Sequence, residues 1–156
     1  MIIFNSRTSK KINIIFLVFF FISIIISVLF FLLGINGTKK TFVFPSVEKN
    51  KYIVESRRLS NEYINPVEYY ICELLLGSQT ERTQSLFPTG TKLKNCICEG
   101  NILYVNLSKE MINRDDHMNI SMRESVDLLR KNILNNFPSI TLVEVFVDGN
   151  AAYYGY

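Results

Sequence analysis

An uncharged stretch near the start of the chain constrains its fold more than any other feature. Residues 12–35 contain no charged side chain, and all but four of them are hydrophobic. The exceptions are Asn13, Ser23, Ser27 and Gly34. At about 1.5 Å per residue, a helix of this length is longer than the ~30 Å hydrocarbon core of a bilayer. The sequence therefore predicts a membrane-spanning helix from Ile12 to Ile35.

Basic residues before this helix predict its orientation. Arg7, Lys10 and Lys11 precede the helix, and residues 1–35 contain no acidic side chain. Short segments rich in Lys and Arg remain in the cytoplasm, so residues 1–11 are predicted to form a cytoplasmic tail. The chain beyond the helix is then expected to lie outside the cytoplasm.

Two observations bear on this orientation. Lys39 and Lys40 follow the helix and reduce the charge contrast between its two sides. A cleaved signal peptide is the alternative, but its apolar core is normally about 7–15 residues long and ends at a small-residue cleavage site. This stretch is longer and has no Ala-x-Ala motif. Anchoring by the helix is therefore the favoured interpretation.

The formal net charge of +3 also belongs to this end of the chain. The three basic residues of the tail account for all of it, and the chain beyond residue 35 is neutral overall. A neutral domain lacks the basic surface that attracts phosphate groups, so nucleic acid is not an expected partner. With 156 residues, the chain has room for one ordinary globular domain.

A linker over residues 36–41 leads into a region of strand and helix patterns. Thr41–Pro45 and Lys51–Glu55 are β-prone stretches on either side of a polar turn, and they could pair as a hairpin. Leu93–Cys98 and Ile102–Leu107 are separated by three residues that include a glycine, which is a second hairpin signal. A last strand is predicted over residues 142–147.

Two helices are predicted between these strands. Asn65 provides an N-cap and is followed by proline, and apolar residues at helical spacing continue until Gly77. Ser121 and Glu124 form a capping box, and a second apolar stripe follows it and ends before Pro138. Both patterns are typical of helices that bury one face.

The element order is strand, strand, helix, strand, strand, helix, strand. This order predicts a small two-layer α+β domain over residues 42–150, followed by a tail over residues 151–156. We expect both helices to pack on one face of a mixed β-sheet. Alternate strand residues should form that buried face, namely Cys96, Cys98, Leu103, Val105, Leu107, Val143, Val145 and Val147.

The same alternation predicts an apolar opposite face. Its residues are Leu93, Ile97, Ile102, Tyr104, Leu142 and Phe146. A solvated sheet face is normally polar, so we expect something to cover this one. Residues 42–54 or the tail tyrosines Tyr153, Tyr154 and Tyr156 could fold over it. The other hypothesis is that these six residues form a partner-binding surface.

Several short motifs occur in an order typical of one protein family. They are Leu86–Leu93, Val105–Ser108, Phe137–Ile140 and Val145–Gly149, and they are preceded by Arg58 and the helix that ends in Leu-Leu-Leu-Gly. Together they span residues 42–150 and resemble the GerMN domain of bacterial sporulation and germination proteins. The chain has a single copy of this pattern.

The resemblance implies a domain held outside the cytoplasm on a lipoprotein or a membrane anchor, and we expect the anchor to be the helix, in the bacterial inner membrane. It implies contact with other envelope proteins or self-association, no catalysis and no cofactor. The chain departs from the family at Asn106, where Asp is common, and it has no Cys near the apolar stretch to accept a lipid. A role in spore formation is therefore not carried over. The alternative function is a periplasmic ligand-binding protein or an enzyme that acts on the cell wall.

Residues suited to catalysis or metal binding are few. His117 is the only histidine, and it follows Asp115 and Asp116 in a polar stretch without a nucleophile motif. Three adjacent residues rarely complete a metal site without ligands from elsewhere. We therefore predict no catalytic residue and no metal.

The three cysteines have an unassigned redox state. Cys96 and Cys98 are two residues apart on a strand, a spacing that differs from the Cys-x-x-Cys of redox enzymes and zinc ribbons. Both are expected to be small core residues. Cys72 lies beside the apolar stripe of the first helix, and a disulfide to one strand cysteine would leave an odd thiol.

Overall fold

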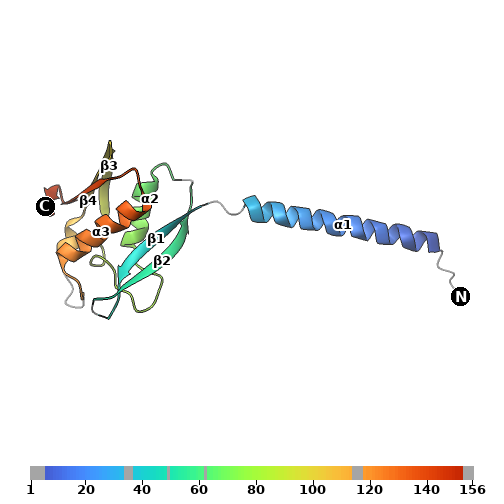
Figure 1. Ribbon diagram of the computed structural model, residues 1–156, viewed down its shortest axis with the longest axis horizontal. Helices are drawn as coiled ribbons and strands as arrows, with labels where there is room; N and C mark the ends of the chain where they lie inside the picture. The colour runs from blue at the N-terminus through green and yellow to red at the C-terminus, as the bar shows by residue number, and fades with distance from the viewer. Residues whose placement is uncertain (1–5, 34–36, 49, 62, 114–117, 153–156) are drawn as a thin grey trace. The chain divides into compact units, whose positions relative to one another are not determined.

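The computed structural model describes residues 6–33, 37–48, 50–61, 63–113 and 118–152 (Figure 1). The chain divides into two compact units, Met1–Asn36 and Gly37–Tyr156. The described residues of the first unit form one helix. The second unit holds the strands and the remaining helices.

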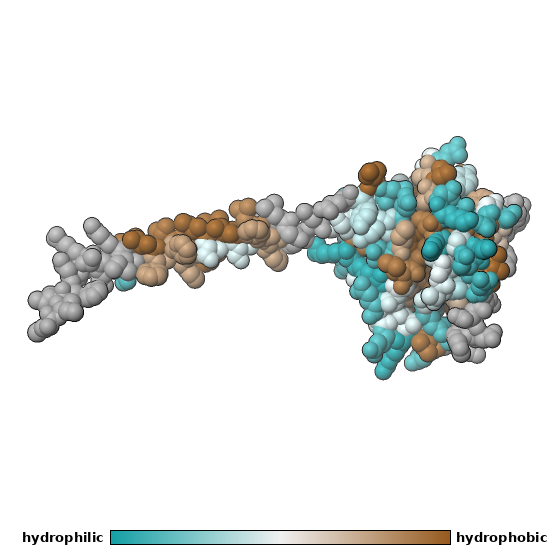
Figure 2. Space-filling model, turned by 180° about the vertical axis from the view of Figure 1, so that it is seen from behind, coloured by the Kyte–Doolittle hydropathy of each residue, from teal (hydrophilic) through white to brown (hydrophobic). Residues whose placement is uncertain are grey.

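Helix α1 spans Ser6–Leu33 and confirms the helix predicted from the apolar stretch. Within it, Asn13–Phe31 has a mean hydropathy of 3.2 and is long and apolar enough to cross a bilayer. Hydrophobic side chains cover most of the described surface of this helix in Figure 2. A membrane anchor and a signal sequence both have these properties. Ile35, the predicted end of the span, lies outside the described residues.

Strands β1 (Thr38–Pro45) and β2 (Tyr52–Leu59) pair as the predicted antiparallel hairpin. They are longer than the β-prone stretches suggested, and they form a two-stranded sheet of their own. Phe42 and Phe44 alternate toward the interior and are fully buried. The expectation that residues 42–54 fold over the apolar sheet face was therefore wrong for these two rings, because they join the core on the helix side.

A second, four-stranded sheet has the order β3-β4-β5-β6. Strand β3 (Leu93–Glu99) is antiparallel to β4 (Ile102–Leu107), which is parallel to β5 (Leu142–Val147), and β6 (Asn150–Ala151) returns antiparallel to β5. The predicted α+β class, with a mixed sheet and two helices after the apolar one, is confirmed. The one short strand β6 and a 3-10 turn, η1 (Lys109–Ile112), are additional.

Both predicted helices begin at the predicted caps. Asn65 Oδ1 accepts hydrogen bonds from the N–H groups of residues 67 and 68 at the start of α2 (Pro66–Leu75). Ser121 and Glu124 form the capping box of α3 (Met122–Asn136). Gly77 follows α2 with a φ of +89°, a conformation that favours glycine. Side-chain caps therefore fix where each helix starts, and the glycine conformation at Gly77 allows the chain to turn after α2.

One core joins the helices to one face of the four-stranded sheet. Leu103, Val105 and Leu107 of β4 are at most 1% exposed, and the valines of β5 are also buried. Tyr70 from α2 and Leu129 from α3 belong to the same cluster. Cys96 packs against this core, but Cys98 is exposed. The expectation of a buried Cys98 was wrong because β3 is an edge strand and Cys98 lies next to its end.

Two asparagines of α3 close the outer edge of the hairpin. The Asn132 side chain accepts from Val43 N–H (2.7 Å) and donates to Val43 C=O (2.9 Å). Asn136 makes the same pair of bonds with Thr41, at 2.8 Å and 2.6 Å. The Tyr70 hydroxyl also donates to Thr41 C=O, at 2.8 Å. Side-chain amides four residues apart on a helix thus take the place of a third strand beside β1.

Candidate functional site

The face of the four-stranded sheet that points away from the helices is the predicted partner-binding surface. Ile97 of β3 and Leu142 of β5 are 58% and 46% exposed. Ile102, Tyr104 and Phe146 are partly exposed on the same face. The strand register places Ile97 opposite Tyr104, and Ile102 opposite Leu142. We call these five residues the open face.

Leu93, the sixth residue predicted for this surface, lies on the other side of the sheet. The β3–β4 register shifts between Leu93 and Asn95, which leaves Lys94 as an extra residue. Leu93 is consequently paired with Leu107 and packs against the core. One inserted residue reverses the faces of the residues before it, so the prediction for Leu93 was wrong.

Two aromatic rings form the centre of the open face. Tyr104 and Phe146 lie on neighbouring strands with ring centroids 6.3 Å apart and planes tilted by 42°. The other residues that line a shallow hollow at these rings are Asn95, Ile97, Asn106 and Gly149. Asn106 Oδ1 also accepts a hydrogen bond from the Gly149 N–H at 3.1 Å. Glu144 lies between Leu142 and Phe146 on this face and is the register partner of Tyr104. The open face therefore combines apolar and polar side chains, as protein interfaces do.

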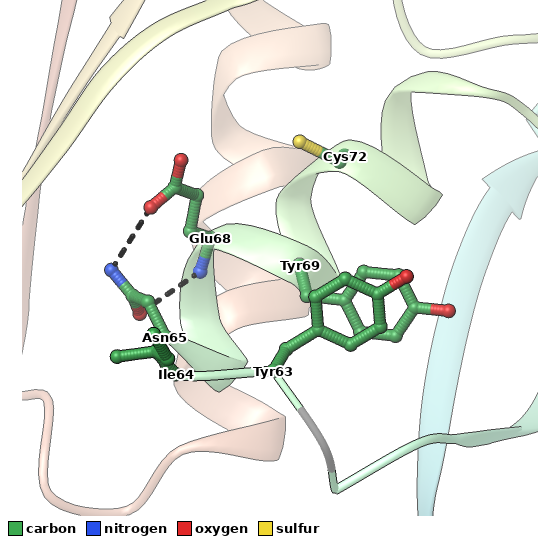
Figure 3. Close-up of a pocket in the computed structure, with 6 residues that line it drawn as sticks. All are labelled: Tyr63, Ile64, Asn65, Glu68, Tyr69 and Cys72. Atoms are coloured by element: carbon green, nitrogen blue, oxygen red, sulfur yellow. Dashed lines mark hydrogen bonds between the residues drawn. The ribbon is translucent and has the colours of Figure 1, made fainter.

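A second hollow lies at the start of α2, and the residue pattern did not predict it (Figure 3). It is lined by Tyr63, Ile64, Asn65, Glu68, Tyr69 and Cys72. The rings of Tyr63 and Tyr69 stack with centroids 3.7 Å apart, and Ile64 is fully exposed. The sequence signal that could have predicted a contact here is Ile64, the apolar residue just before the N-cap, because such a residue usually packs on the first turn of the helix. Here Tyr63 packs there instead of Ile64.

Arg57 ties β2 to the end of α2. Its guanidinium donates to the Glu55 carboxylate and to Gly77 C=O, both at 2.7 Å, and it lies 4.7 Å from the Phe42 ring centroid. The Arg57 and Glu55 side chains are only 9% and 12% exposed. The hydrogen bond from Arg57 holds the pKa of Glu55 below its usual range. The neighbouring Arg58, which the family resemblance singled out, is exposed.

The cysteines are free thiols on α2 and β3. Burial raises the pKa of Cys96 to about 12, and burial also raises the pKa of Cys72. A raised pKa leaves little thiolate at neutral pH, which makes both groups weak nucleophiles and weak metal ligands.

The polar stretch that the sequence offered for catalysis or metal binding is His117 with Asp115 and Asp116. These three residues lie outside the described residues. Within the described ranges, no three His, Cys, Asp or Glu side chains are placed to hold a metal ion.

The architecture defines the class of domain. The tandem GerMN domains of the sporulation protein GerM from Bacillus subtilis match with a TM-score of 0.58 and 15% identity, over 74% of this chain and 40% of that chain. The first GerMN domain of the same protein matches with a TM-score of 0.55 and 15% identity, over 71% of this chain and 84% of that chain. These matches show that the fold is that of a GerMN domain.

The family follows from the sequence match. The model of the Germane family, described as sporulation and spore germination, matches residues 29–153. The chain belongs to this family, which confirms the predicted resemblance. A comparison of this chain with curated proteins found no match. The chain spans 40% of the length of the tandem GerM structure, so that protein's activity and partners are not assigned to it.

Proposed function

We propose that this chain is a single-pass membrane protein that holds its Germane-family domain outside the cytoplasm, where the open face binds another envelope protein or a second copy of the domain. The role is assembly or recognition without catalysis. The exposed apolar surface of the four-stranded sheet is the observation that carries this proposal.

The chemistry of the open face supports protein contact. Ile97 and Leu142 expose aliphatic surface beside the Tyr104 and Phe146 rings. Tyrosine and phenylalanine are enriched in interfaces because a large rigid ring buries much area at a small entropic cost. Exposed Ile97 lies on β3, an edge strand, so a partner could approach without displacing another element of the described residues. The tail tyrosines Tyr153, Tyr154 and Tyr156, which could also cover this face, lie outside the described residues. A few such central residues usually carry most of the binding free energy.

The proposed location depends on α1 and on the charges before it. Arg7, Lys10 and Lys11 favour a cytoplasmic N-terminus by the positive-inside rule. Alkaline extraction of membranes, followed by protease treatment of intact cells and spheroplasts, tests this topology. Protection of the domain from protease in spheroplasts would refute the proposed orientation, and release by alkaline extraction would refute the anchor.

Binding by the open face is tested with the full chain. A photo-crosslinking amino acid at Ile97 should give defined adducts in membranes. The double substitution Tyr104→Glu and Phe146→Glu should abolish these adducts, because two carboxylates would be desolvated on binding.

The matched control changes two exposed apolar residues elsewhere. Val54→Glu and Ile64→Glu together introduce the same charge on the hairpin and at the start of α2, and should leave the adducts unchanged. Adducts that survive in the Tyr104→Glu/Phe146→Glu variant, with circular dichroism showing a retained fold, would overturn the proposal.

A further inference from the structure

The point where the chain enters the domain is fixed against the end of strand β2. Gly37 has a φ of +154°, and a Cβ at this position would lie 2.7 Å from Leu59 C=O and 3.6 Å from Arg58 Cβ. Thr38 Oγ1 also donates to Asn61 Oδ1 at 2.8 Å. The first residues of the domain are therefore held beside Arg58 by a close backbone approach and a side-chain hydrogen bond.

Two basic residues stand directly opposite each other at this point. Lys39 of β1 is the cross-strand partner of Arg58 of β2, and both are exposed. No ion pair of the described residues includes either side chain. Like charges at facing strand positions repel each other, so this pair does not help to hold the hairpin together. Two adjacent cations are suited to binding an anion between or beside them.

The short connection to α1 indicates which class of anion the two basic residues could bind. Three residues, 34–36, separate Leu33 at the end of α1 from Gly37. At no more than about 3.6 Å per residue, four steps along the chain span about 14 Å or less. The polar headgroup layer of each leaflet is roughly 5–8 Å thick. If α1 spans a bilayer, phosphate groups lie within reach of long basic side chains at residues 39 and 58.

The geometry points to a lipid-binding site: we propose that Lys39 and Arg58 bind the phosphate groups of anionic phospholipids at the outer surface of the membrane. Arginine can donate two parallel hydrogen bonds to a phosphate, and lysine adds a point charge. This inference depends on the proposed membrane anchor. It goes beyond that function because it assigns a second contact with the membrane, made by the folded domain itself.

Hydrogen exchange on the full chain in lipid nanodiscs tests the site. Nanodiscs of phosphatidylglycerol are compared with nanodiscs of phosphatidylcholine, and amide exchange is followed over residues 38–41 and 57–60. Each basic side chain near an anionic surface contributes about fivefold to binding. Exchange at this end of the hairpin should therefore be roughly 5- to 25-fold slower in the anionic nanodiscs, and 0.5 M NaCl should remove the difference.

Charge reversal identifies the residues responsible. Lys39→Glu with Arg58→Glu should give equal exchange in both lipids. The control, Lys92→Glu with Lys109→Glu, reverses two exposed basic residues next to the Leu107 end of β4, and should keep the difference. Both variants change the net charge equally, so a general electrostatic effect would alter them alike.

The outcomes separate this site from the proposed function. Equal exchange of the unmodified chain in both lipids, with α1 still in the nanodisc, would overturn the lipid site and leave the anchor intact. Equal protection in phosphatidylcholine on adding millimolar inorganic phosphate would assign the pair to a soluble anion and overturn the lipid site. A chain that does not remain in nanodiscs would overturn the anchor and with it this inference.

Discussion

Replacement of Asn132 by leucine tests whether a helix replaces a strand beside β1. Leucine has the same branched arrangement of heavy atoms but cannot bond to the N–H and C=O of Val43, and Asn132 is fully buried. An unpaired buried backbone group costs about 1–3 kcal/mol, so two groups should lower the free energy of unfolding by about 4 kcal/mol. This is a large share of the 5–15 kcal/mol typical of a small domain.

Urea denaturation of residues 37–156 measures this loss. The chain contains no tryptophan, so circular dichroism is the suitable probe. With an m-value near 1.5 kcal/mol/M, the midpoint should fall by about 2–3 M. Hydrogen exchange should show the loss of protection first at Val43, since its two bonds to Asn132 are removed, whereas Thr41 keeps its bonds to Asn136.

Asn135→Leu is the matched control on the same helix. Asn135 is exposed, and its replacement should change the free energy of unfolding by less than about 0.5 kcal/mol. A loss below about 1 kcal/mol for Asn132→Leu, or equal losses in the two variants, would refute the view that side-chain amides close this edge.

Three further predictions concern charged and reactive groups. Arg57→Met should lower the free energy of unfolding by about 3–5 kcal/mol, because Glu55 would remain desolvated without its partner, whereas Arg58→Met should be nearly neutral in the same urea titration. The pKa of Glu55 in the folded domain lies below the reference value of 4.5, so the ionised carboxylate stabilises the fold fully above pH 4.5, and this contribution is lost as the pH falls through the folded-state pKa. Glu55→Gln should therefore flatten the acid side of a curve of unfolding free energy against pH, and an unchanged curve would contradict this. Iodoacetamide at pH 8 should modify exposed Cys98 before Cys96, whose pKa is about 12, and peptide mass spectrometry showing the reverse order would refute the assigned burial.

Most elements could be predicted because their signals are local. The caps at Asn65 and Ser121 are bonds between residues two or three apart, and the structure begins both helices there. Strands β4 and β5 begin and end at the predicted residues, since alternating, mostly apolar runs bounded by turn residues mark half-buried strands. The aromatic centre of the open face was also predictable, because alternation assigns Tyr104 and Phe146 to one side.

The errors arose where long-range packing or one residue decides the outcome. The bulge at Lys94 moved Leu93 into the core, and nothing in the sequence marks that extra residue. The hairpin forms a separate sheet because Asn132 and Asn136 occupy the edge of β1, a contact between residues about 90 positions apart. The stacked pair Tyr63 and Tyr69 was missed because aromatic side chains around a helix start usually indicate ordinary packing.

The asparagine contacts also set an order of events during synthesis. Val43 meets Asn132 across a separation of 89 residues, so the hairpin is made long before the helix that completes it. At translation rates of about 5–20 residues per second, that interval is roughly 4–18 s. During this time Phe42 and Phe44 have been synthesised but α3, which packs on β1, has not. Other β-prone segments could pair with the bare strand in that window, so crowding of nascent chains should favour misassembly of this domain at its first strand.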